Sequence, residues 1–78
     1  MAQNIHLDVS QLEAPEPLRR ILSVLPRLNS SGQLIVTHRR EPCLLYPILE
    51  RNGFIWNTQV QNGYWMIHIR RIRERPES

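Results

Sequence analysis

Residues 54–71, FIWNTQVQNGYWMIHIRR, decide the fold of this chain. Two runs rich in aromatic and β-branched residues, 54–60 and 64–71, flank the tripeptide 61–63, which contains Asn-Gly. Asn-Gly between two such runs is a strong signal for a β-hairpin, because both residues of a type I′ turn need positive φ angles. The sequence therefore predicts two antiparallel strands here.

Alternation along the second run divides its side chains between two faces of a sheet. Trp65, Ile67 and Ile69 form an apolar face, which we expect to lie under helices. The opposite face would carry Tyr64, Met66, His68 and Arg70, together with His6 and Asp8 from the first predicted strand. This open face is apolar enough to suggest a protein partner there, or a homodimer formed through it.

The residues before the hairpin indicate two strand–helix units. Residues 5–9 alternate apolar and polar side chains, as in a half-buried strand. A proline-containing loop leads to Pro15, which suits the first position of a helix, and Pro26 should end that helix near Val24 or Leu25. The helix carries its apolar side chains at helical spacing: Leu18, Ile21, Leu22, Leu25 and Leu28.

The second unit begins with residues 33–37, where three large apolar residues follow one another as in a strand at the centre of a sheet. Pro42 can open a second helix, and Asn52-Gly53 is a good signal for its end. Its apolar positions would be Leu44, Leu45, Ile48 and Leu49.

The predicted element order is strand, helix, strand, helix, strand, strand. Right-handed crossovers make the first three strands parallel, and the hairpin makes the last strand antiparallel to its neighbour. We therefore predict an α+β fold: a two-layer α/β sandwich of order βαβαββ, with a four-stranded mixed sheet and two helices on one face. Residues 1–78 would form a single domain, with 1–4 and 73–78 as frayed termini.

Composition bounds the functional class. The 78-residue chain has 41% hydrophobic and 22% charged residues, as an ordinary globular domain does. One cysteine excludes an intramolecular disulfide. No apolar run approaches the roughly 20 residues of a membrane span, and the N-terminal residues lack the features of a secretory signal. We therefore expect a cytoplasmic protein without a membrane partner.

The sequence contains no recognisable catalytic or cofactor motif. His6, His38 and His68 match no metal-ligand spacing, and Asp8 is the only aspartate. All three glycines suit turns, which leaves no glycine-rich phosphate loop. We therefore expect neither an enzyme nor a bound metal or cofactor.

Three short motifs, in this order, resemble the TusA/SirA family of small bacterial sulfur carriers. They are Leu7-Asp8, then Ala14-Pro15-Glu16-Pro17-Leu18, then Ser31-Gly32-Gln33-Leu34. That family opens with Leu-Asp, carries Cys-Pro-x-Pro at the start of its first helix and Pro-Gly-x-x-Leu before its second strand, and folds as a βαβαββ sandwich. The segment from His38 to Pro42 resembles uncharacterised relatives that lack the carrier cysteine. Those relatives often carry His-Asp-x-x-Pro at this place, and here Arg39 replaces the aspartate.

The resemblance implies that the carrier thiol is missing. A sulfur carrier needs a nucleophilic thiolate at the helix start, where the helix dipole stabilises negative charge, and position 14 is alanine. We therefore hypothesise a non-catalytic interaction or regulatory module on a sulfur-carrier fold. Its protein-binding residues would be Pro15, Glu16, His38, Arg39, Arg40, Tyr64, Met66 and His68.

Cys43 has two interpretations. Free cysteines are usually buried, and Cys43 precedes an apolar run, so we expect a structural role. The alternative is a thiol carrier or redox sensor, because Cys43 follows Pro42 at a predicted helix start, close in sequence to His38, Arg39 and Arg40.

Nucleic-acid binding is the other alternative function. All ten basic residues are arginines, whose planar donors suit phosphates, but the net charge is only +3, which argues against strong binding to a nucleic-acid backbone. A binding stripe would consist of Arg39, Arg40, Arg70, Arg71, Arg73 and Arg75 near Tyr64 and Trp65. Aromatic side chains on a sheet would then stack on RNA bases. The alternative interpretation is that the C-terminal arginines simply form the solvent-exposed end of the last strand.

Overall fold

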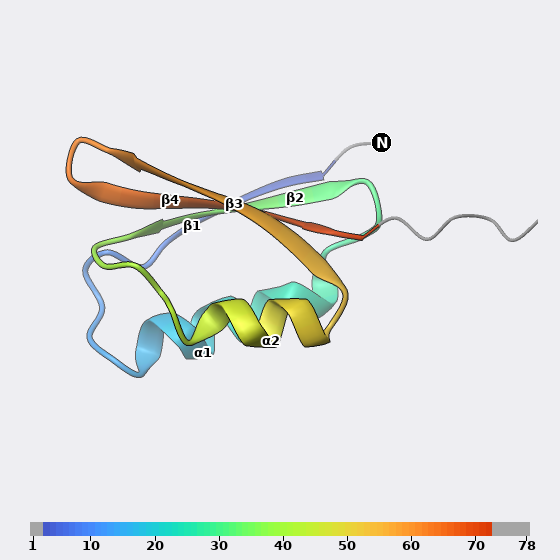
Figure 1. Ribbon diagram of the computed structural model, residues 1–78, viewed down its shortest axis with the longest axis horizontal. Helices are drawn as coiled ribbons and strands as arrows, with labels where there is room; N and C mark the ends of the chain where they lie inside the picture. The colour runs from blue at the N-terminus through green and yellow to red at the C-terminus, as the bar shows by residue number, and fades with distance from the viewer. Residues whose placement is uncertain (1–2, 73–78) are drawn as a thin grey trace, which may run out of the picture.

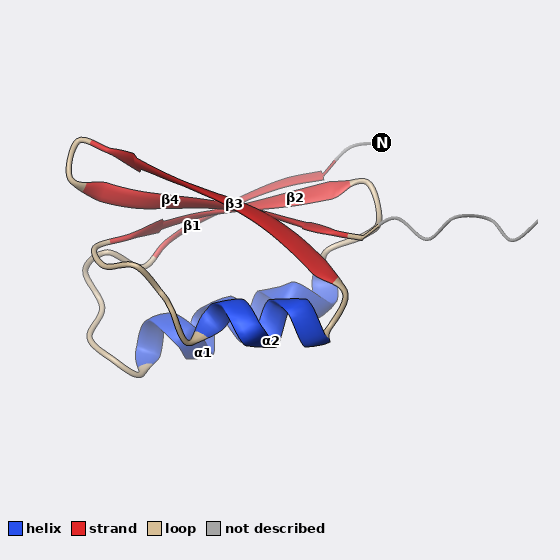
Figure 2. Ribbon diagram, in the orientation of Figure 1, coloured by secondary structure: helices blue, strands red, loops and turns tan. Residues whose placement is uncertain are grey.

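Two helices cover one face of a four-stranded sheet, and the other face is open (Figures 1 and 2). The computed structural model describes residues 3–72. Its elements in chain order are β1 (Gln3–Asp8), α1 (Glu16–Val24), the 3-10 helix η1 (Leu25–Arg27), β2 (Gly32–His38), α2 (Leu45–Arg51), β3 (Phe54–Gln61) and β4 (Tyr64–Arg71). The strand order is β1-β2-β4-β3; β1 and β2 are parallel, and β4 is antiparallel to both β2 and β3. The predicted α+β sandwich of order βαβαββ is confirmed.

The hairpin forms where the Asn-Gly pair predicts it. Gln61 pairs with Tyr64 across the turn, and Asn62 and Gly63 have φ angles of 52° and 82°. Both angles are positive, as a type I′ turn requires. Because β4 then pairs with β2, the hairpin places β3 at an edge of the sheet.

The core lies between the sheet and the helices. Eleven apolar side chains are buried in it: Val9, Ile21, Leu25, Leu28, Leu34, Val36, Leu45, Leu49, Phe54, Ile67 and Ile69. In β4, Ile67 and Ile69 are buried and Trp65 packs against them, as the alternation predicts. On the opposite face, one cross-strand row contains His6, Ile35, His68 and Asn57.

The start of α2 differs from the prediction. The helix begins at Leu45 rather than at Pro42, and Leu44, predicted as one of its apolar positions, precedes the helix and is 78% exposed. Pro47 explains the difference, because it lacks an N–H group. In a helix that began at Pro42, the carbonyl of Cys43 would need the N–H of residue 47 as its hydrogen-bond donor. In α2 as observed, Pro47 is the third residue, and N–H groups in the first turn of a helix have no intrahelical acceptor, so no hydrogen bond is lost.

The first strand begins earlier than expected. Gln3 pairs with Gly32 in the parallel register, and its side-chain oxygen accepts the backbone N–H of Asn29 at 3.0 Å, so Gln3 and Asn4 belong to β1 rather than to a frayed terminus. The other residues predicted to fray, 1–2 and 73–78, lie outside the described residues. Among the helices of residues 3–72, none has the length and apolar character needed to cross a membrane.

Candidate binding pocket at the start of α1

A pocket of about 480 Å³ lies between the start of α1 and the segment that joins β2 to α2. Its walls consist of Leu12, Glu13, Ala14, Pro15, Pro17, Leu18 and Ile21 on one side and residues 38–45 on the other. β1 and β2 are parallel neighbours, so the residues that follow them emerge at the same end of the sheet. Ligand sites of open α/β sheets are found at such carboxyl ends of strands.

A turn after β1 sets the path of the first wall. The backbone N–H and the hydroxyl of Ser10 both donate to Oδ1 of Asp8, at 2.9 and 2.7 Å, and these bonds lower the pKa of the Asp8 carboxyl. Ser10 is itself buried. The chain therefore leaves the sheet in a fixed direction before it reaches the pocket.

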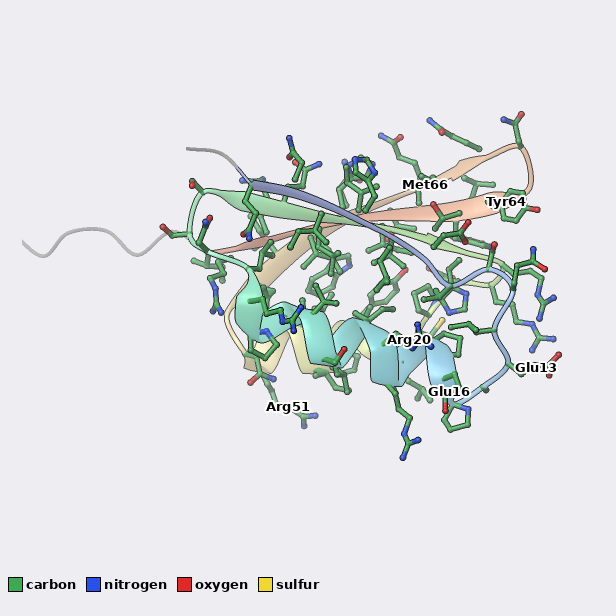
Figure 3. The ribbon with its side chains drawn as sticks, turned by 180° about the vertical axis from the view of Figure 1, so that it is seen from behind. Glu13, Glu16, Arg20, Arg51, Tyr64 and Met66 are labelled. Atoms are coloured by element: carbon green, nitrogen blue, oxygen red, sulfur yellow. The ribbon has the colours of Figure 1, made fainter. Side chains whose placement is uncertain are left out.

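Four of the five motif residues line the α1 wall: Ala14, Pro15, Pro17 and Leu18. Pro15 is the N-cap rather than the first helical residue that the sequence predicts, and it lines the pocket together with Pro17. Glu16 is the first helical residue, and its carboxylate lies 3.4 Å from Arg19 outside the pocket. Figure 3 shows Glu13 and Glu16 at this end of the helix. The α1 side of the pocket is therefore apolar, with Glu13 as its acidic residue.

His38 is held by the opposite wall. Its Nδ1 accepts the backbone N–H of Arg40 at 3.1 Å. Burial, and then the charges of Arg39 and Arg40, lower the pKa of the His38 imidazole. The neutral ring therefore carries its proton on Nε2, which makes His38 a hydrogen-bond donor at neutral pH.

Arg39 and Arg40 are exposed and line the pocket. Within residues 3–72, neither guanidinium lies within 4.0 Å of a carboxylate. The nearby Glu41 carboxylate instead accepts the Tyr46 hydroxyl at 3.3 Å. The two arginines therefore remain available for an anionic group of a ligand.

Cys43 is exposed, which contradicts the expected buried, structural role. The late start of α2 is the reason, because it leaves Cys43 in the turn before the helix, where its N–H donates to the carbonyl of Glu41 at 2.9 Å. Cys43 lines the same pocket as Ala14, on the opposite wall.

Three of the predicted binding residues lie elsewhere. Tyr64, Met66 and His68 are on the open face of β4, and Figure 3 shows Tyr64 and Met66 near the hairpin. His68 Nδ1 lies 3.1 Å from Nε2 of Gln33, and Met66 accepts the Thr37 hydroxyl at 3.5 Å. The proposed binding residues therefore fall into two separate groups.

The open face is more polar than the sequence prediction assumed. Its polar residues are Asn4, His6, Asp8, Gln33, Thr37, Asn57, Gln59, Gln61, His68 and Arg70, by the strand register. Large exposed apolar side chains on it are limited to Ile55 and Tyr64 within the described residues. His6 and His68 lie on either side of Ile35 in one row, and the described residues contain no group of three or more metal-ligating side chains.

The arginines do not form the single stripe that the sequence suggested. His38 pairs with Trp65 and Leu34 with Ile69, so Arg39 and Arg40 lie at the opposite end of the sheet from Arg70 and Arg71. Arg71 also lies on the helix side, where its Nε donates to the carbonyl of Leu28 at 2.6 Å. Arg73 and Arg75 lie outside the described residues.

Several residues of the pocket were not among the predicted binding residues, including Leu12, Glu13 and Leu44. Leu12 is the one large apolar residue between the first strand and the first helix, which was a usable signal. Leu44 was assigned to the apolar side of the second helix because its spacing fits the helical period. Glu13 carried no signal in the sequence.

The structure defines a small two-layer α/β domain with a pocket at the carboxyl ends of two parallel strands. The chain belongs to an uncharacterized conserved protein family, DUF2249, whose family profile matches residues 6–71. No curated protein and no solved structure matches the chain.

Proposed function

We propose that this chain is a non-catalytic interaction module, built on a fold of the TusA/SirA sulfur-carrier type without the carrier thiol. The pocket supports the proposal, because it joins the Ala14-Pro15 segment to the His38–Cys43 segment. These are the two segments that resemble the sulfur carriers and their uncharacterised relatives. Alanine at position 14 has no nucleophilic group, but the residues that line the pocket around it can contact a partner protein.

The chemistry of the pocket suits a protein segment that carries an apolar side chain next to a carboxylate. The walls are mainly apolar, and a volume of about 480 Å³ is large enough for one or two side chains. Arg39 and Arg40 provide planar donors without a carboxylate partner in residues 3–72, and the neutral His38 provides a further donor. A partner would bind by burying its side chain while its carboxylate bonds to the arginines.

A photo-crosslinking residue in place of Leu44 tests this proposal in cells. Leu44 lines the pocket and is 78% exposed, so we expect it to trap a partner that the same crosslinker at Ser30 does not trap. Ser30 is also exposed but precedes β2, at the other end of the sheet. The double substitution Arg39→Glu/Arg40→Glu should reduce the trapped partner by at least about tenfold.

Arg20→Glu/Arg51→Glu is the matched control, because both arginines are exposed and neither lines the pocket. It introduces the same change of charge and should leave the yield unchanged. Equal trapping from positions 44 and 30, or an equal loss in both double variants, would contradict a role for the pocket.

A thiol carrier is the second candidate, because Cys43 is exposed in the pocket that contains Ala14. In that reaction a donor persulfide transfers its outer sulfur to the Cys43 thiol, so that the donor becomes a thiol and Cys43 becomes a persulfide. When the chain is incubated with a cysteine desulfurase and cysteine, we expect intact mass spectrometry to show no increase in its mass. A gain of about 32 Da on the wild type, absent from Cys43→Ser, would favour the carrier over the non-catalytic module.

A further inference from the structure

The edge strand β3 lacks the features that usually prevent edge pairing. Its eight residues, FIWNTQVQ, include neither a charged residue nor a proline, and β4 covers only one of its sides. Proteins usually protect a free edge with charges, prolines, bulges or very short strands, because unpaired backbone groups can pair with another chain. The other edge, β1, is shorter and carries Asp8 on its open face.

We propose that two copies of this chain pair through antiparallel β3 strands and form one continuous eight-stranded sheet. An antiparallel pair of identical strands has a two-fold axis perpendicular to the sheet, so the helices of both copies lie on the same side. The contact is self-complementary, and the absence of charge from β3 means that the two copies do not repel each other there. This dimer is independent of the pocket, and it forms through the edge of β3 rather than by stacking of two open faces.

Side-chain pairing indicates the register. With the axis at Thr58, Trp56 lies opposite Val60 of the second copy on the helix side. Aromatic and β-branched residues form favourable cross-strand pairs, and Val60 is 56% exposed in the single chain. Tyr46 stacks on Trp56 with ring centroids 5.3 Å apart, so the indole is already held beside the edge.

The same register pairs amides on the open face. Asn57 lies opposite Gln59 of the second copy, and both residues are exposed in the single chain. Their amide groups can exchange hydrogen bonds, and no carboxylate or cation of either strand is involved. On both sides of the sheet, the side chains that meet across the contact therefore come from β3 itself and form favourable pairs.

Charge substitutions at these two exposed positions test the dimer. Asn57→Lys/Gln59→Lys places like charges opposite each other, and Asn57→Glu/Gln59→Glu does the same with the opposite sign. We expect each variant alone to dimerise at least about tenfold more weakly than the wild type, because opposed like charges destabilise strand pairs. An equimolar mixture should dimerise again, since lysine then faces glutamate.

Sedimentation velocity from about 10 μM to 1 mM measures this equilibrium, because a contact of one strand pair belongs to the weak class of interfaces. Asn4→Lys/His6→Lys on β1 is the matched control and should dimerise as the wild type does, since both residues are exposed at the other edge. A monomer mass for the wild type at every concentration overturns the proposal, as does an equal weakening by the β1 variant.

Disulfide trapping tests the register. In a Cys43→Ser background, Thr58→Cys should form a disulfide-linked dimer, because residues opposite each other in an antiparallel pair have Cα atoms about 5.5 Å apart. Ile55→Cys should not, since its counterpart in the second copy lies about six residues, or roughly 20 Å, along the strand. Crosslinking at Ile55, or none at Thr58, rules out the axis at Thr58.

Discussion

Replacing Ile67 by alanine is expected to lower the free energy of unfolding by about 3–4 kcal/mol. Ile67 is fully buried in β4, a central strand that pairs with both β2 and β3. The substitution removes three methyl or methylene groups and leaves a cavity that surrounding strands are poorly able to close. A domain of this size has a total stability of about 4–12 kcal/mol, so the loss is a large part of it. The melting temperature should fall by about 15–25 °C.

Ile55→Ala is the matched control for this prediction. The same atoms are removed from the neighbouring strand, but Ile55 is 40% exposed on the open face. We expect a loss below about 1 kcal/mol, measured by urea unfolding at a low protein concentration. Similar losses at the two positions would show that the helix-covered face does not supply the stability of the domain.

Much of the fold follows from local signals in the sequence. Asn62-Gly63 fixes the turn, and alternation in β4 correctly assigns Ile67 and Ile69 to the core. The strand order is not local information: whether β4 or β3 pairs with β2 depends on how the finished hairpin packs on the preceding strands and helices. The sequence therefore predicted the hairpin, but not that β3 lies at an edge.

The pocket was predictable in its position but not in its composition. The sequence puts His38 directly after the predicted strand 33–37 and shortly before the predicted helix start at Pro42, and the pocket lies at this strand end. The exposure of Cys43 was missed because apolar spacing alone extends α2 back to Leu44, whereas the missing N–H of Pro47 delays the helix to Leu45. Pro47 was therefore a better guide to the start of α2 than the apolar spacing that includes Leu44.

Arg71 illustrates a contact that no local pattern contains. Alternation with Ile67 and Ile69 puts it on the helix side, but its partner is 43 positions away in sequence. Its Nε donates to the carbonyl of Leu28 at 2.6 Å, and its Nη2 lies 3.4 Å from the carbonyl of Leu25. Its guanidinium also lies 4.9 Å from the ring centroid of Phe54. Arg71 therefore connects the end of β4, through hydrogen bonds, to the C-terminal end of the α1–η1 segment.

Arg71→Met is expected to lower the free energy of unfolding by about 2–3 kcal/mol. A hydrogen bond from a charged group contributes about 1.5–3 kcal/mol, and the contact with Phe54 adds a smaller cation–π contribution. Methionine keeps an apolar stem of similar length but donates nothing, so the part-buried carbonyl of Leu28 loses its side-chain donor. Arg71→Lys should recover part of the loss, because an ammonium can reach one carbonyl but lacks the planar fork that reaches two.

Arg70→Met separates this contact from the general effect of removing one positive charge. Arg70 is the neighbour of Arg71 in the same strand, but it is exposed on the open face. We expect its replacement to change the free energy of unfolding by less than about 0.5 kcal/mol in urea, with an unchanged slope against urea concentration. If the two substitutions cost the same, Arg71 acts only through its charge, and the bonds to Leu28 and Leu25 do not stabilise the fold. If Arg71→Lys is as stable as the wild type, the fork geometry is not required.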